Sequence, residues 1–398
     1  GCRLEGRGYS HVVRSAASAR WLIMATLALS DYRRLIIKVG SSLLVDNAGD
    51  LNRDWLDTLV QDIAALQRDG HEILIVSSGS IAIGSNILGI NKARARLEDL
   101  QAAAAAGQVQ LVHAYQEVLG QRAITAAQVL LTPEDTENRR RFLNARGTLE
   151  RLVDRKVIPI INENDTVATE EIRYGDNDRL AARVAQLVMA DALVLLSDVD
   201  GFYTADPGKD PEARHIPEVS HITADMQSMA GETRSDVGSG GMATKVQAAR
   251  IATHAGCSTI IASGKVSHPL RALSTGGRCT VFKAEGTPAA ARKQWLAGVL
   301  EVSGEMRVDD GALRALRTGN SLLPVGVVSI AGNFSRGDVV RITGPDGAEL
   351  GRGLAEYSAT EADLIAGCQS EQIEDKLGYR GRSVMVHRDE LVLFNGDS

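Results

Sequence analysis

The segment "VIPIINENDTVATEEIRYGDNDRLAA", residues 157–182, is the most informative part of the sequence for predicting the fold. Its first part, 157–161, is apolar, and a segment crowded with Asn, Asp and Glu follows at once. Such an apolar run is typical of a strand that is buried on both faces of a parallel sheet. In open α/β sheets, ligands bind beyond the carboxyl ends of the strands. We therefore predict that the polar segment belongs to a ligand site; a solvated surface loop is the alternative.

Similar apolar runs recur on both sides of this stretch. They alternate with segments of helical periodicity, of which 52–70 and the Ala-rich 97–120 are the clearest. Thr132, followed by Pro133, is a typical helix start. The other apolar runs are 35–39, 73–78, 127–132, 192–198 and 258–263. This alternation predicts an α/β fold with a mostly parallel open sheet sandwiched by helices.

The pattern changes near residue 300, where Gly and turn-forming pairs begin to separate short alternating stretches. This change predicts a second, small β-rich domain. We divide the chain into an extension (1–30), an α/β domain (31–290), a linker (291–304) and a β-rich domain (305–392).

The extension 1–30 is rich in Arg and poor in acidic residues. A targeting peptide has this composition. We favour the interpretation that the extension is disordered or results from a start upstream of Met24, because nothing in its pattern predicts a fold.

Composition excludes several classes of protein. The 398 residues carry a net charge of −6, so the whole chain lacks the basic character of a nucleic-acid-binding protein. No apolar run approaches the roughly 20 residues that span a membrane. The cysteines are far apart and have no metal-ligand spacing, which predicts reduced thiols in a cytoplasmic protein. They are Cys2, Cys257, Cys279 and Cys368.

Two lysines stand in unusual positions. Lys38 lies inside the apolar run 35–39, where a charge is costly unless it is paired. Lys245 follows the Gly-rich segment 237–241, near the start of a predicted helix, where the helix dipole does not favour a cation. We expect the ammonium groups of both lysines to face an anion, most simply a phosphate. For Lys38, the alternative is a lysine that simply lies on an edge strand of the sheet.

Small residues follow several predicted strands. Gly40 and Ser41, the segment 77–84, and the pair Ser197 and Asp198 all stand at strand ends. Free backbone N–H groups at such places can hold phosphate, although ordinary turn chemistry uses the same residues. The chain lacks GxxxxGK[ST], a complete GxGxxG, HExxH and GxSxG, so neither a P-loop nor a catalytic serine is expected.

Together, these segments resemble the amino acid kinase family and, within it, the glutamate 5-kinases. The resemblance runs from about residue 35 to 390, and its most specific part is NENDTVA followed by GDND. The segment 319–340 resembles the PUA domain of bacterial members, with Asn320 replacing a serine. The other matching segments are 36–44, 75–84, 141–149, 195–207 and 238–249.

The resemblance implies ATP-dependent phosphorylation of the γ-carboxylate of L-glutamate to γ-glutamyl phosphate, the first step of proline biosynthesis. It implies that Lys38 and Lys245 flank the transferred phosphoryl group and that Asp178 orients both lysines. The implied substrate-binding residues are Ser78, Asn162, Asp165, Asp176 and Asn177. The implied ATP-binding residues are Lys38, Gly40, Ser41, Ser197, Asp198, Ser239, Gly240, Gly241, Met242, Ala243, Thr244 and Lys245.

The chemistry fits this set of residues. A γ-carboxylate has a pKa of about 4.3 and is already ionised at neutral pH, so no general base is required. Catalysis then consists of positioning and charge neutralisation by the lysines and Mg²⁺. We expect phosphate oxygens and water to hold the Mg²⁺, without assigned protein ligands, and the amides of Gly40 and Ser41 to assist. The family also implies a homo-oligomer, a tetramer or a dimer, and inhibition by proline.

Two alternatives remain at this point. Another member of the family could act on aspartate, N-acetylglutamate, carbamate or UMP; a nucleotide acceptor would favour more arginines than Arg173 and Arg179 in the polar loop. An RNA-binding PUA protein is the alternative from a different class. The domain 305–392 mixes Arg with many acids and lacks a basic aromatic stripe, which argues against RNA.

Overall fold

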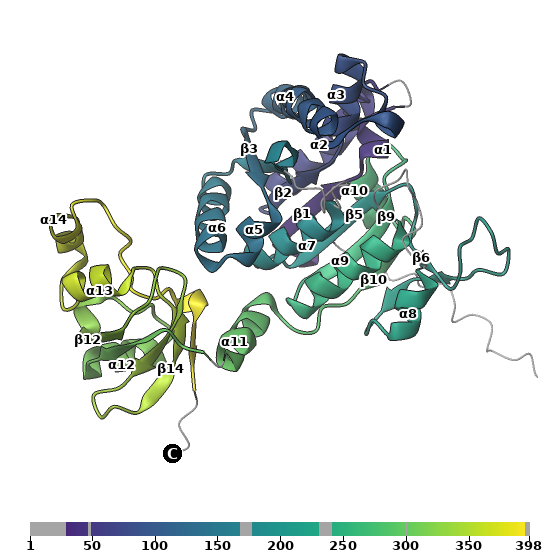
Figure 1. The fold of residues 1–398 in the computed structure, drawn as a ribbon. Coiled ribbons are helices and arrows are strands. Elements are labelled where there is room, and N and C mark those ends of the chain that lie inside the picture. Colours follow the sequence, from purple (N-terminus) through teal and green to yellow (C-terminus); the bar gives the residue numbers. More distant parts are fainter. Residues whose placement is uncertain (1–28, 47–48, 168–176, 231–240, 300, 395–398) are drawn as a thin grey trace, which may run out of the picture.

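The computed structural model describes residues 29–46, 49–167, 177–230, 241–299 and 301–394. In these ranges, a large α/β domain and a smaller C-terminal domain lie next to each other (Figure 1). Helix α11 (Pro288–Gly298) connects them. No helix in the described ranges is both long and apolar enough to cross a membrane.

The large domain is built on an eight-stranded sheet with the order β3-β4-β2-β1-β5-β9-β10-β8. Neighbouring strands from β3 to β9 run parallel, and β10 is antiparallel to β9. The prediction of a mostly parallel sheet is therefore confirmed. The strands are β1 (Arg34–Val39), β2 (Glu72–Ser77), β3 (Ala126–Leu131), β4 (Ile158–Glu163), β5 (Ala192–Ser197), β8 (Glu218–Val219), β9 (Ser258–Ser263) and β10 (Cys279–Phe282).

Helices cover both faces of this sheet because its central strands are apolar on both sides. In β1, Leu35 and Ile37 pack into a core with α2, α4 and α10, whereas Ile36 packs into a second core with α6, α7 and α9. Successive side chains of a strand point to opposite faces, so Lys38 is on the second side with Ile36. The helices are α2 (Arg53–Arg68), α4 (Leu97–Gly120), α6 (Arg139–Asp154), α7 (Asn177–Leu187), α9 (Met242–His254) and α10 (Pro269–Ser274).

Capping residues set the helix starts where the sequence predicts them. Asn52 Oδ1 accepts a hydrogen bond from Trp55 N at 3.2 Å at the start of α2. Thr132 precedes the short helix α5 (Pro133–Glu137), and the Asp135 carboxylate accepts from Thr132 N at 2.6 Å. Shorter elements of this domain are α1 (Ser41–Leu44), α3 (Ser80–Leu88), β6 (Phe202–Tyr203), β7 (His215–Ile216) and α8 (Ala224–Met229).

The C-terminal domain is β-rich, as predicted. Its five-stranded sheet has the order β12-β11-β13-β14-β15, and helices pack on it around Met306, Val340 and Ile342. The elements are β11 (Gly304–Val308), α12 (Asp310–Arg317), β12 (Val327–Gly332), β13 (Val339–Thr343), β14 (Glu349–Leu354), α13 (Ala359–Ile365), α14 (Ile373–Leu377) and β15 (Leu391–Leu393).

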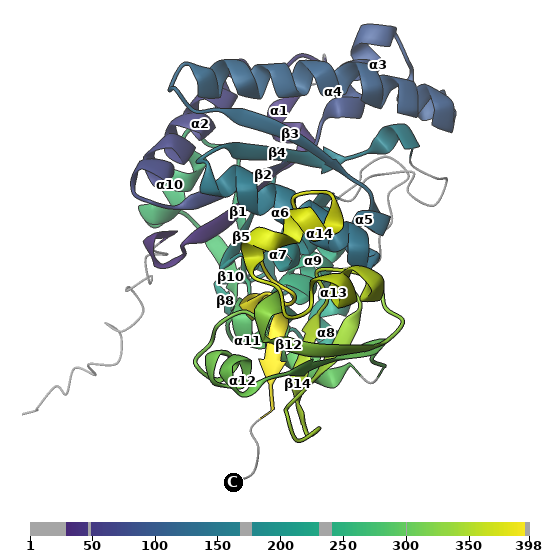
Figure 2. The ribbon, with the colours of Figure 1, turned by 90° about the vertical axis from the view of Figure 1, so that its left-hand side faces the viewer.

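The segment predicted as a linker, 291–304, contains most of α11 and the first residue of β11. Leu296 of α11 is fully buried and packs with Leu143 of α6 and with Val339 and Leu354 of the C-terminal domain. The two domains therefore share a small apolar core. In the view of Figure 2, the C-terminal domain lies in front of the large domain.

The predicted extension, 1–30, lies outside the described residues except for its last two. Leu29 begins the short helix η1 (Leu29–Asp31) and is only 2% exposed. The described part of the chain thus includes two residues of the predicted extension.

Candidate active site

The strand ends that carry the predicted site residues meet at one edge of the sheet. In the register of the parallel strands, Val39 of β1 pairs with Ser77 of β2 and with Leu196 of β5. The chain continues from β1 to β2 on one side and returns to β5 on the other, so this edge is a topological switch point. Open α/β sheets bind their ligands at such a point.

Asp178 lies between the two predicted lysines. Its Oδ1 is 2.5 Å from Lys38 Nζ, and its Oδ2 is 3.1 Å from Lys245 Nζ. Asp178 is fully buried, and Lys38 and Lys245 are 6% and 3% exposed. Two ammonium groups this close would repel each other strongly inside a protein, and the shared carboxylate offsets that repulsion. Among these three side chains, two positive charges and one negative charge sum to +1.

The environment keeps Asp178 ionised. Burial by itself raises the pKa of this carboxyl, but the charges and hydrogen bonds of Lys38 and Lys245 outweigh burial and hold its pKa below the usual value. Asp178 also stands in the first turn of α7, where the helix dipole favours a negative charge. Thr244 Oγ1 lies 3.1 Å from Asp178 Oδ2 and adds a further hydrogen bond.

The unusual position of Lys245 has an explanation within the chain. The expected anion near this lysine is, at least in part, the Asp178 carboxylate. The residue that precedes the first turn of α9 is Gly241, which has no side chain to cap the helix. Among the described residues, no side chain at the N-cap position makes a capping hydrogen bond, and N–H groups at such a helix start suit an anionic ligand.

A second network, made of amides and hydroxyls, lies beside the lysines. Asn177 Nδ2 is 2.8 Å from Ser78 Oγ and 3.0 Å from Asn162 Oδ1. Asn162 Nδ2 in turn is 2.7 Å from Gln108 Oε1 and 3.2 Å from Ser80 Oγ. The structure thus brings together three of the predicted substrate residues and adds Ser80 and Gln108.

Asp165 completes this side of the site. It begins the short helix η3 (Asp165–Val167) directly after β4. Burial raises the pKa of its carboxyl to about 6, and a hydrogen bond with the Ser80 side chain opposes that shift. Asp165 therefore takes up a proton close to the physiological pH range.

The predicted nucleotide residues lie at the neighbouring strand ends. The Gly40 amide, however, donates to Leu196 O at 3.2 Å, which continues the pairing of β1 with β5. This N–H is thus already hydrogen-bonded within the sheet, and a contact of Gly40 with phosphate stays a prediction. Ser197 is buried and its Oγ accepts from Val199 N at 3.3 Å, whereas Asp198 is exposed.

Three predicted residues, Asp176, Ser239 and Gly240, lie outside the described residues. The remaining predicted nucleotide residues are Ser41 at the start of α1 and Met242, Ala243 and Thr244 in the first turn of α9. Ser80 and Gln108 are absent from the predictions. Ser80 stands in the predicted strand-end segment 77–84, but Gln108 follows an Ala-rich stretch that carries no sign of a site.

The described residues contain no group of three His, Cys, Asp or Glu side chains placed to hold a metal ion. At the centre of the site, the Asp178 carboxylate is already bound by both lysines. The described side chains therefore do not form a Mg²⁺ site of their own.

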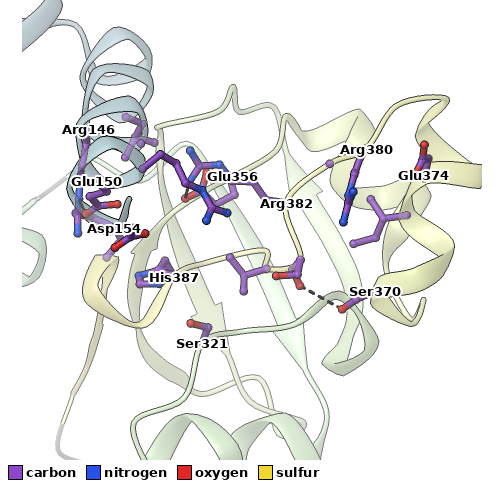
Figure 3. A pocket seen from close by; sticks show the side chains of 18 of the residues that line it. Arg146, Glu150, Asp154, Ser321, Glu356, Ser370, Glu374, Arg380, Arg382 and His387 are labelled. Carbon is purple, nitrogen blue, oxygen red and sulfur yellow. Dashed lines mark hydrogen bonds and ion pairs between the residues drawn. The ribbon is translucent and has the colours of Figure 1, made fainter. Parts of the chain in front are cut away.

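A cavity of about 880 Å³ lies elsewhere, between α6 and the C-terminal domain (Figure 3). Arg146 and Glu150 line it from α6, and Glu356 and Arg382 line it from the other side. Many of its charges are paired: Glu356, for example, accepts from Arg382 at 3.1 Å. None of the predicted site residues lines this cavity, so we place the candidate active site at the sheet edge.

Comparison with known proteins agrees with this architecture. The model of the amino acid kinase family matches residues 33–263, and the PUA domain model matches residues 304–377. Glutamate 5-kinase of Rhodopseudomonas palustris (strain BisB5) is 54% identical over 371 residues, which is 93% of this chain and 99% of that protein. Glutamate 5-kinase 1 of Mesorhizobium japonicum is 54% identical over 366 residues, which is 92% of this chain and 97% of that protein.

A further relative, the glutamate 5-kinase of Agrobacterium fabrum, is 53% identical over 92% of this chain and 94% of its own length. Among solved structures, a UMP kinase from Bacillus anthracis superposes with a TM-score of 0.44 at 16% identity, over 64% of this chain and 98% of that one. The family models and the curated relatives lead to one conclusion: the chain belongs to the amino acid kinase family, in the group of the glutamate 5-kinases, and carries a C-terminal PUA domain.

Proposed function

We propose that the protein transfers the γ-phosphoryl group of ATP to the γ-carboxylate of L-glutamate, giving γ-glutamyl phosphate and ADP, the first step of proline biosynthesis. One observation carries this proposal. Asn177 belongs to the amide network and the next residue, Asp178, to the lysine cluster. An amino acid held by the first network would present its side-chain carboxylate to the second. The high identity to glutamate 5-kinases supports this choice of substrate.

On the substrate side, the groups present suit an amino acid head group. Asn177, Asn162 and Ser78 offer amide and hydroxyl groups, and Asp165 offers a carboxylate for an ammonium group. Burial raises the pKa of Asp165, and a bound ammonium would oppose that effect. We infer that the α-ammonium of glutamate binds next to Asp165 and Asn177.

For the chemical step, the substrate carboxylate needs no base because it is ionised at neutral pH. One of its oxygens forms a bond to the γ-phosphorus, while the bond to the β–γ bridging oxygen breaks and ADP leaves with that electron pair. The difficulty is the approach of two anions. Lys38 and Lys245, held 2.5 and 3.1 Å from Asp178, supply fixed positive charge where negative charge accumulates.

ATP would lie along the same edge of the sheet. The uncapped first turn of α9, next to Gly241, suits its phosphates. We propose that Mg²⁺ enters as part of Mg-ATP and is held by phosphate oxygens and water, in keeping with its preferred ligands. Ser197 is the last residue of β5, Asp198 follows it, and both remain our candidates for contacts with the nucleotide.

We further propose that the protein works in the cytoplasm as a homo-oligomer, a tetramer or a dimer, and that proline inhibits it at the glutamate site; the family resemblance supports these points. Aspartate or N-acetylglutamate as acceptor, and RNA binding as the main function, remain alternatives to be tested. The C-terminal domain matches a PUA model, but it mixes basic with many acidic side chains.

The experiment that tests the proposal is direct. The protein is mixed with Mg-ATP and a panel of amino acids, and any acyl phosphate is trapped as a hydroxamate with hydroxylamine. We expect trapping with L-glutamate and not with aspartate or N-acetylglutamate as acceptor. Trapping with aspartate but not with glutamate would overturn the substrate assignment. A filter-binding assay with RNA at physiological salt tests the alternative that RNA binding is the main function.

A further inference from the structure

We propose that Gln108 is a positioning residue for substrate recognition. Through Asn162, it determines which atom of Asn177 faces the amino acid. The inference rests on the proposed function, since it concerns the same pocket. Gln108 is on α4, is only 8% exposed and has no role among the sequence-predicted residues.

A close contact between two helices brings Gln108 to the strand ends. Gly107, the residue before it, lies where α4 crosses the start of α3. A Cβ atom on Gly107 would be 1.8 Å from the carbonyl oxygen of Ser80, so this helix contact requires glycine. Because α4 approaches so closely, the side chain of Gln108 reaches Asn162 at the end of β4.

The orientation of Asn162 is set by a backbone donor. The N–H of Glu163 donates to Asn162 Oδ1 at 2.9 Å, and a backbone N–H can only donate. Asn162 Nδ2 therefore points the other way, toward Gln108 Oε1 at 2.7 Å and Ser80 Oγ at 3.2 Å. Gln108 is the closer of these two acceptors and holds the amide group in place.

The orientation passes on to Asn177. Because Asn162 presents an oxygen, Asn177 must present its Nδ2, which donates at 3.0 Å. The Oδ1 of Asn177 is thereby turned away from Asn162. This buried oxygen has no hydrogen-bond partner among the described residues, and neither does Gln108 Nε2.

These two atoms match an amino acid head group. Buried polar atoms normally have hydrogen-bond partners. An acceptor and a donor without partners in one network therefore indicate that a bound ligand supplies the missing partners. An α-amino acid brings an ammonium group that donates and an α-carboxylate that accepts. We infer that Asn177 Oδ1 accepts from the α-ammonium, and that losing the Gln108 acceptor weakens this contact more than any other.

The test replaces the acceptor while conserving the shape of the side chain, with Gln108→Met. The matched control is Gln110→Met, on the same helix but exposed. For each protein, kcat/KM is measured by hydroxamate trapping with L-glutamate and with glutarate, which lacks the α-ammonium but keeps the carboxylates. We expect Gln108→Met to lower the preference for glutamate over glutarate about 10- to 100-fold, as for a buried donor that loses its partner. The KM of Gln108→Met for ATP should stay close to the wild-type value. Gln110→Met should keep the wild-type preference for glutamate over glutarate.

A second variant, Gln108→Glu, keeps an acceptor for Asn162 and replaces the Nε2 donor by a carboxylate oxygen. We expect it to retain most of the preference for glutamate, and its result stands even if Gln108→Met fails to fold. Equal losses with glutamate and glutarate, an unchanged preference in Gln108→Met, or a Gln108→Glu variant that loses the preference completely would each overturn the inference. If the wild-type protein phosphorylates a different amino acid, the proposed function is wrong, and the same comparison with that amino acid and its des-amino analogue still tests Gln108.

Discussion

Asn177 and Asp178 are consecutive residues whose side chains enter two different networks. The Asn177 amide donates to Ser78 Oγ at 2.8 Å, whereas the Asp178 carboxylate lies 2.5 Å from Lys38 Nζ. Both residues are buried in the first turn of α7. One turn of helix thus joins a pocket suited to an amino acid to a pair of lysines suited to phosphoryl transfer. Substitutions at these two positions should therefore have separable effects.

Asp178→Asn should lower kcat far more than it raises KM for glutamate. Asparagine keeps the size and some hydrogen bonding but loses the charge that holds two repelling ammonium groups together. Loss of one well-placed electrostatic group typically costs on the order of 10²–10³ in rate. Steady-state kinetics measure both constants, with Asp69→Asn at the exposed end of α2 as the control. A variant with near-normal kcat and only weaker glutamate binding would contradict the role proposed for Asp178.

Asn177→Ala should weaken the binding of glutamate more than it slows the chemical step. It removes the amide that contacts Ser78 and Asn162, so KM for glutamate should rise while kcat at saturation falls less than in Asp178→Asn. An unsatisfied buried network typically costs about 1–3 kcal/mol, which corresponds to roughly 10- to 100-fold in affinity. KM for ATP serves as the internal reference. If kcat fell as far as in Asp178→Asn with KM unchanged, the division of labour between the two residues would be wrong.

KM for glutamate should depend on pH through Asp165. Burial raises the pKa of this carboxyl to about 6, so below that pH it is mostly neutral in the free protein. An ammonium group binds the ionised form, and binding must then release a proton. We expect KM to be nearly constant above about pH 7 and to rise up to about tenfold per pH unit below pH 6. The glutamate γ-carboxyl, with a pKa of about 4.3, stays ionised over most of this range.

The Asp165→Asn variant supplies the control, because it should bind glutamate more weakly and lose the pH dependence between pH 5 and about 7. The measurement is KM for glutamate across this range at constant ionic strength. A wild-type profile that is flat down to about pH 5 would show that Asp165 does not bind the ammonium group.

The contact between the domains should depend on Glu390. Its carboxylate is 2% exposed, accepts from Arg292 Nε at 2.8 Å and also pairs with Arg146 of α6. Removing one partner of a buried ion pair typically costs about 3–5 kcal/mol, so Glu390→Ala should lower the midpoint of thermal unfolding clearly. Asp389→Ala, next to it but 42% exposed, should change stability by less than about 1 kcal/mol.

Kinase activity measured well below the unfolding temperature should survive in Glu390→Ala, since the described active-site residues all belong to the large domain. The C-terminal domain of the variant should also become more sensitive to limited proteolysis. An unchanged unfolding midpoint together with unchanged proteolysis would show that this ion pair does not hold the domains together.

Much of the fold could be predicted from local patterns. Strands such as Arg34–Val39 and Ala192–Ser197 are buried on both sides, so each is a nearly continuous apolar run that is visible without any partner. The start of α5 was equally visible, because Thr132 and Pro133 act on the helix through the neighbouring backbone. The boundary near 291–304 was less visible, since the burial of Leu296 depends on residues of two other elements.

The open α/β sheet, the β-rich second domain and the residue types at the strand ends follow from local patterns, because apolar periodicity, turns and caps act over a few residues. Packing alone places Asp178 between Lys38 and Lys245, pairs the Gly40 amide with Leu196 O, and brings Gln108 to Asn162. Those contacts join residues from separate strands and helices. Their distances follow from how the elements pack, such as the close approach of α4 to α3 at Gly107, which no local pattern encodes.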